Sequence, residues 1–105
     1  MSSETKYEKF YNSITALEGD DKSKVAKFLR LRIEYLLGIK DWTIYRLSKS
    51  ADLPYSTLNN LMAGRGAIGV HTLLKIVSAL GVSLDEFFKP YYEVVLQNGT
   101  LWEFT

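Results

Sequence analysis

A chain of 105 residues, of which 47% are hydrophobic and 24% charged, has the composition of one globular domain and contains no apolar run of membrane-spanning length. The absence of cysteine excludes disulfides and thiolate chemistry, and a single histidine argues against a transition-metal site. We therefore expect no cofactor and, by default, a cytoplasmic location.

The formal net charge is only +1, but the charge is unevenly distributed. Residues 22–89 carry 11 basic and 5 acidic side chains, whereas the two ends together carry 2 basic and 7 acidic ones. A basic middle between acidic ends favours contact with a polyanion. The alternative is ordinary solvated surface charge.

The first part of the chain carries two helical patterns. Apolar residues recur at intervals of three and four over residues 7–17, which predicts an amphipathic helix that Gly19 ends. A second helix is predicted to begin near Asp21 or Ser23 and to end at Gly38. Its apolar stripe consists of Val25, Phe28, Leu29, Ile33, Leu36 and Leu37.

A short helix is predicted next. Thr43 is a good N-cap for a helix that runs through Ser50 and turns Leu47 inward. The sequence ADLP, residues 51–54, then breaks this helix and leaves a tight turn.

The second short helix is predicted over residues 54–62, because Pro54 suits a first helical turn. Leu58 and Leu61 form its inward side, and Gly64 caps its C-terminal end. Gly64 also opens the stretch GRGAIG, which spells the dinucleotide-binding pattern G-x-G-x-x-G. That pattern needs a strand before it, whereas a helix precedes it here, so we interpret these glycines as shaping a loop.

Residues 70–80 predict a further helix, which Gly81 ends. Its inward side consists of Leu73, Leu74, Val77 and Leu80. Ser83 and Glu86 have the spacing of a capping box at the start of a last helix, which Pro90 stops. The apolar side of that helix consists of Leu84, Phe87 and Phe88.

The C-terminal stretch YYEVVLQNGTLWEFT changes character. Asn98 and Gly99 stand between two runs of β-forming residues, which predicts a hairpin over residues 93–104. Both faces of this hairpin are apolar, and an isolated hairpin is only marginally stable. We expect it to form part of a dimer interface; the alternative is that it caps the core of its own chain.

Two short helices joined by a tight turn describe a helix-turn-helix. Residues 43–64, TIYRLSKSADLPYSTLNNLMAG, followed by HTLLKIVSALGVSLDEFF, resemble the lambda repressor and Cro-like helix-turn-helix family, also called XRE-like. The matching positions are Leu47, Ser48, Leu58, Leu61 and Gly64. The resemblance implies a mostly α fold: a DNA-binding domain of about five helices over residues 22–89. The expected additions are an N-terminal amphipathic helix (residues 1–21) and a C-terminal β-hairpin (residues 90–105).

The chain departs from the family pattern at three positions. Asp52 stands where the family has a turn glycine, although aspartate tolerates the left-handed region better than most residues. Ile44 replaces a glutamine that contacts phosphate in the family. Pro54 replaces the usual Ser or Thr cap of the recognition helix.

The outer side of the second short helix is polar and uncharged. It consists of Tyr55, Ser56, Asn59 and Asn60. An asparagine amide matches N6 and N7 of adenine in the major groove, and the N-terminal residues of such a helix meet the bases first. The resemblance implies Tyr55, Ser56 and Asn60 as base contacts, with Asn59 close by. The alternative is an ordinary solvated helix face.

Phosphate contacts are expected around this helix. The candidates are Lys40, Thr43, Arg46, Lys49, Thr57 and Arg65. The helix that Thr43 opens has no carboxylate in its first turn, which leaves its N-terminus ready for an anion. Arg65 follows the recognition helix directly. For each cation the alternative is plain surface charge.

The sequence therefore predicts a homodimer that binds a double-stranded DNA operator and regulates transcription as a repressor, without enzymatic activity. The alternative keeps the fold but changes the role. In that case the chain is an antitoxin-type or adaptor protein whose main partner is another protein.

Overall fold

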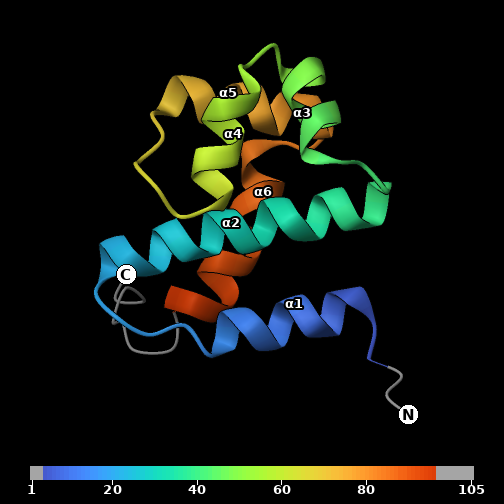
Figure 1. Ribbon diagram of the computed structural model, residues 1–105. Helices are drawn as coiled ribbons and strands as arrows, with labels where there is room; N and C mark the ends of the chain where they lie inside the picture. The colour runs from blue at the N-terminus through green and yellow to red at the C-terminus, as the bar shows by residue number, and fades with distance from the viewer. Residues whose placement is uncertain (1–3, 97–105) are drawn as a thin grey trace.

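The computed structural model describes residues 4–96, which form six α helices and a terminal π-helical segment, η1 (Figure 1). The elements are α1 (Lys6–Thr15), α2 (Asp21–Lys40), α3 (Ile44–Ala51), α4 (Tyr55–Met62), α5 (Val70–Leu80), α6 (Leu84–Pro90) and η1 (Tyr91–Leu96). The described residues contain no strand, which agrees with a mostly helical fold. None of their helices has the length and apolarity needed to cross a membrane.

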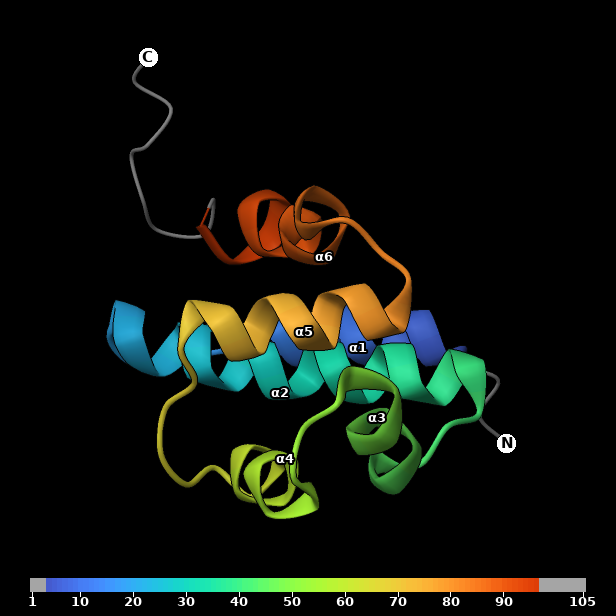
Figure 2. The same ribbon diagram turned by 90° about the horizontal axis from the view of Figure 1, so that it is seen from above.

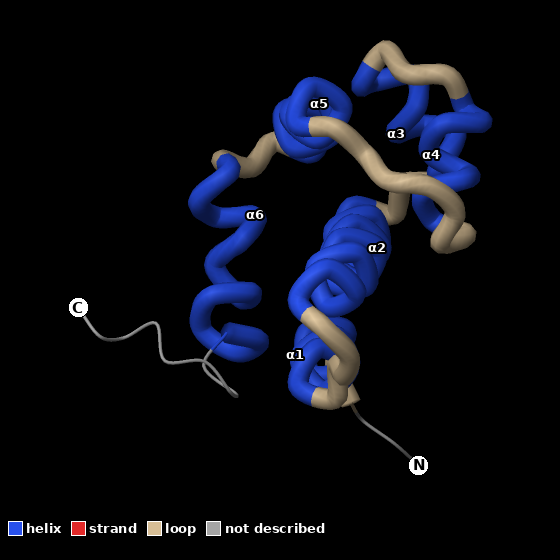
Figure 3. The backbone as a smooth tube through the Cα atoms, turned by 90° about the vertical axis from the view of Figure 1, so that its left-hand side faces the viewer, coloured by secondary structure: helices blue, strands red, loops and turns tan. Residues whose placement is uncertain are grey.

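The long helix α2 lies at the centre of the molecule. Figure 3 views it nearly end-on, with α1 below it, α5 and α6 on one side, and α3 and α4 on the other. Each of the helices α2 to α6 contributes at least one side chain with no exposed surface. These side chains are Phe28, Ile33, Leu47, Leu58, Ile76 and Phe87. A single core therefore holds the two short helices against the rest of the domain.

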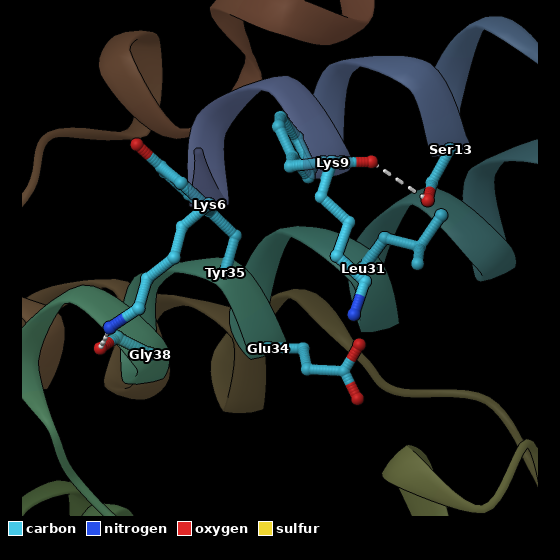
Figure 4. Close-up of a pocket in the computed structure, with 8 residues that line it drawn as sticks. Lys6, Lys9, Ser13, Leu31, Glu34, Tyr35 and Gly38 are labelled. Atoms are coloured by element: carbon cyan, nitrogen blue, oxygen red, sulfur yellow. Dashed lines mark hydrogen bonds between the residues drawn. The ribbon is translucent and has the colours of Figure 1, made fainter. Parts of the chain in front are cut away.

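Helix α1 packs along α2 through part of the predicted apolar stripe, of which Tyr7 and Tyr11 are exposed. Phe10 and Ile14 are buried, and Thr5 and Glu8 form a capping box at the start of the helix. The Lys6 ammonium group donates a hydrogen bond of 2.8 Å to the carbonyl oxygen of Gly38 in the last turns of α2 (Figure 4). A cation at this end of α2 also complements the helix dipole.

The prediction that Gly38 ends α2 is wrong. The helix continues to Lys40, and Asp41 then adopts the left-handed conformation with φ of 59°. Its N–H donates to Gly38 at 3.3 Å, and the N–H of Trp42 donates to Leu37 at 3.0 Å. This pair of bonds closes the helix at an aspartate, a position where sequence patterns point to glycine.

Two leucines that were predicted to face inward are exposed. Leu74 on α5 and Leu84 on α6 have exposed fractions of 44% and 43%. The buried face of α5 consists of Val77 and Leu80, as predicted, together with Ile76. Helical spacing alone did not decide which side of an apolar helix faces the core.

The predicted C-terminal β-hairpin is wrong in the part that the structure describes. Pro90 is the last residue of α6, as predicted, but no strand follows it: η1 continues the helical path through residues 93–96, which were assigned to the first strand. Val94 and Val95 are buried, and η1 packs against α1 and α6. A helical turn places both adjacent valines against this core, so tertiary packing overrides the β-propensity of the run. Residues 97–105, with the proposed Asn98-Gly99 turn, lie outside the described residues.

Candidate nucleic-acid interface

Helix α3 is closed at both ends by local hydrogen bonds. The Thr43 hydroxyl accepts a bond of 3.1 Å from the N–H of Arg46, which confirms the predicted N-cap. At the other end Asp52 adopts φ of 56°, and the N–H of Leu53 donates to Ser48 at 3.0 Å. Asp52 thus makes the left-handed turn that is usually made by glycine.

Helix α4 follows this turn and presents the predicted polar face. Pro54 lies at the N-cap position, without a side-chain capping bond, and Leu58 and Leu61 are buried. Tyr55, Ser56, Asn59 and Asn60 are exposed, and Thr57 is half-buried. Figure 2 shows α3 and α4 together on one side of the molecule, with α6 on the opposite side and α2 and α5 between them.

The end of α4 fixes the start of the loop that follows. Gly64 has φ of +80°, its N–H donates to Leu61 at 3.0 Å, and the N–H of Arg65 donates to Asn60 at 2.8 Å. This pair of bonds is a Schellman motif, which needs a residue that tolerates positive φ. The glycine-rich stretch is therefore a loop between two helices, as predicted.

The side chains of Arg65 and Asn60 are also joined. Arg65 Nε and Nη2 lie 3.1 Å and 2.9 Å from Asn60 Oδ1, and both donate to it. The structure thus brings together one residue predicted to read a base and one predicted to contact phosphate.

Basic side chains around α3 lie over aromatic rings. The Arg46 guanidinium is 4.6 Å from the centre of the Trp42 ring, and Lys40 Nζ is 5.2 Å from the same ring. Lys49 Nζ lies 5.3 Å from the ring of Tyr45. Such contacts hold each cation in place while its charge stays accessible.

The predicted phosphate contacts do not form one cluster. Lys40 ends α2, whereas Arg65 lies in the loop between α4 and α5, and Figures 1 and 2 show these segments at opposite ends of α2. The structure therefore places predicted cations at both ends of the surface formed by α3 and α4.

Two residues of this surface were not identified from the sequence. Tyr45 is 57% exposed, and its ring lies 6.5 Å from that of Tyr55 on α4. Its place two residues before the buried Leu47 was the signal that it faces outward. Arg30 on α2 lies beside the end of α4, since a β-carbon on Gly64 would be 3.7 Å from its Cζ. Arg30 and Gly64 come close only in the folded chain, so no local pattern in the sequence indicates their proximity.

Acidic and metal-ligating groups do not gather into a metal site in the part of the chain that the structure describes. A family model described as "Helix-turn-helix" matches residues 33–87, which include α3, the turn and α4. No curated protein and no solved structure matches the chain.

Proposed function

Since the chain belongs to the lambda repressor-like helix-turn-helix family of DNA-binding transcription regulators, we propose that it is a repressor that places α4 in the major groove of a specific operator. The observation that carries this proposal is the exposed, uncharged polar face of α4, with basic side chains at both ends of the surface around it. A neutral face avoids indiscriminate attraction to phosphates and leaves discrimination to hydrogen bonds with base edges.

Base reading is assigned to the outer residues of α4. Tyr55 and Ser56 stand in its first turn, where a recognition helix meets the bases, and Asn59 follows one turn later. The Asn59 amide can accept from N6 and donate to N7 of adenine. The Tyr55 ring, supported by Tyr45, offers an apolar surface for a thymine methyl group.

Phosphate contacts are assigned to groups around this face. Thr43 and Arg46 lie at the start of α3, which has no acidic residue in its first turn, and Lys49 follows in its last turn. Lys40 and Arg65 extend the positive charge on either side. Charges at these places would fix the register of α4 on the duplex without specifying its sequence.

We further propose that the chain acts as a homodimer, because two recognition helices related by a two-fold axis reach successive major grooves about 34 Å apart. Sedimentation at several concentrations tests this, and a monomeric mass at all of them, with or without DNA, would contradict it. The C-terminal hairpin is not part of this proposal.

Selection from a pool of random-sequence double-stranded DNA tests the function as a whole. Enrichment of a palindromic motif is expected, and Asn59→Ala should relax the motif at one position of each half-site. The matched control is Asn12→Ala, which removes an exposed amide from α1, away from α3 and α4. If no motif is enriched, the proposed repressor function is contradicted and a role in protein binding is favoured.

A further inference from the structure

Arg65 is tied to Asn60 through both its backbone and its side chain. The backbone bond of 2.8 Å closes α4, and two side-chain bonds of 3.1 Å and 2.9 Å converge on Asn60 Oδ1. Resting on the DNA-binding function proposed above, we infer that Asn60 is a positioning residue. It aims the Arg65 guanidinium at phosphate oxygens of the DNA and does not itself read a base.

The acceptor that base reading needs is already in use. A carbonyl oxygen has two lone pairs, and Asn60 Oδ1 receives two N–H groups from Arg65. Recognition of adenine requires the same oxygen to accept from the N6 amino group. In this arrangement Asn60 offers only its Nδ2 donors to a ligand.

Among the residues that the structure describes, no hydrogen bond uses the outer edge of the Arg65 guanidinium, so this edge can bind a ligand. Arginine has five N–H donors, of which Asn60 takes the Nε donor and one at Nη2. The remaining donors at Nη1 and Nη2 lie at the end of the fork, the edge that matches two oxygens of a phosphate. Without Asn60 the exposed side chain would sample many rotamers, and binding would have to restrict them.

The surroundings add to the attraction for an anion. Arg30 lies beside Gly64, so a second guanidinium stands near the end of α4. The Gly64 conformation fixes where residue 65 leaves the helix. The end of α4 and the Asn60 oxygen therefore fix where the Arg65 guanidinium lies. Arg30 adds a second positive charge near the end of the same helix.

The salt dependence of binding separates this role from base reading. Asn60 is neutral, so its loss should leave the salt slope unchanged if it only reads a base, and should lower the slope if it positions Arg65 on a phosphate. We would measure affinity for a double-stranded fragment of arbitrary sequence between 50 and 200 mM KCl. Arg65→Ala should lower the salt slope by about one unit for each bound protomer, so that, per protomer, its affinity falls about fourfold less over this range than that of the wild type. Asn60→Ala should reproduce most of this change and should add little in the Arg65→Ala background.

Asn12→Ala is the matched control, since it removes an exposed amide from α1, outside the proposed DNA-binding surface. Its salt slope should equal that of the wild type. A further readout without DNA is the Arg65 Nε–H resonance, which should exchange with solvent faster in Asn60→Ala than in the wild type.

The outcomes separate the inference from the function on which it rests. A wild-type chain that binds no DNA would overturn both. A wild type that binds while Asn60→Ala keeps the full salt slope would overturn the positioning role alone. Losses limited to sites with one particular base pair would likewise overturn the phosphate assignment, because a phosphate contact weakens binding to all sequences equally.

Discussion

Arg32 makes the hydrogen bond that Pro90 cannot make. Pro90 lies inside α6 and has no N–H for the carbonyl oxygen of Glu86, four residues earlier. Arg32 Nη2 donates to this oxygen at 2.9 Å, and its Nε donates to the carbonyl of Phe87 at 2.9 Å. Because a side chain from α2 satisfies these carbonyls, the chain continues into η1 beyond the proline.

The environment of Arg32 is largely apolar. Its Cζ lies 5.5 Å, 5.7 Å and 5.9 Å from the ring centres of Phe10, Tyr35 and Phe87. Burial lowers the pKa of the Arg32 guanidinium, although arginine stays charged in proteins. The aromatic faces and the two carbonyls compensate the charge for its lost hydration.

Arg32→Met should strongly destabilise the fold. The substitution keeps an apolar stem but removes the Arg32 donors to the carbonyl oxygens of Glu86 and Phe87, at a cost of about 1–3 kcal/mol for each group left buried and unpaired. We expect urea denaturation to show a loss of about 2–4 kcal/mol in the free energy of unfolding.

Pro90→Ala provides the partner experiment. Alanine restores an N–H that can donate to Glu86, so it should recover part of the stability lost in Arg32→Met. Equal losses in the single and the double variant would show that Arg32 does not act through the carbonyl that Pro90 leaves open.

Gly64→Ala should destabilise the domain by about 1–2 kcal/mol, because an L-residue is strained at φ of +80°. The new β-carbon would also lie 3.7 Å from Arg30 Cζ, an ordinary contact, so the cost should come from the backbone. Gly69→Ala is the control: its φ is −83° and nothing lies within 4 Å of the added carbon. A Gly64 variant as stable as the control would contradict the strain argument.

Asp52→Gly should stabilise the protein by about 0.5 kcal/mol. Glycine relieves the left-handed strain and removes a negative charge from the C-terminal end of α3, and these gains exceed its larger chain entropy when unfolded. Thermal unfolding should show a higher midpoint for Asp52→Gly and a lower one for Asp52→Ala, which keeps the strain and lacks the tolerance of aspartate for this region. A lower midpoint for the glycine variant would refute this account.

Tyr91 should make stability fall at high pH. Burial raises the pKa of its phenol, and the nearby carboxylate of Asp21 adds to the effect. Above pH 10 the unfolded chain therefore releases this proton while the folded chain retains it, so rising pH favours unfolding. Below pH 10 the phenol stays protonated in both states, so its contribution to the free energy of unfolding is fully present.

The measurement is the free energy of unfolding between pH 8 and 11 for the wild type and Tyr91→Phe. The wild type should lose stability more steeply above pH 10, whereas lysine titration affects both proteins. If the two proteins lose stability in parallel above pH 10, the pKa of Tyr91 is not raised by folding.

Local signals in the sequence were sufficient for most of the helix-turn-helix. The Thr43 cap, the inward Leu47, Leu58 and Leu61 and the glycine at residue 64 all act within a few residues of the chain. Their effects are capping bonds, helical periodicity and allowed φ values, which do not depend on distant contacts. The polar face of α4 followed from the same periodicity.

Tertiary structure decided the features that join distant segments. Pro90 was predicted to end a helix because its missing donor is visible in the sequence, whereas Arg32, which replaces the donor, stands 58 residues earlier. The valines of η1 became helical because their burial against α1 outweighs β-propensity. From the sequence, the Asn60 amide was expected to be available to a base. In the fold, the turn at Gly64 brings Arg65 back so that it donates to the Asn60 oxygen. In each case a partner that only the folded chain brings close changed what a residue type by itself predicts.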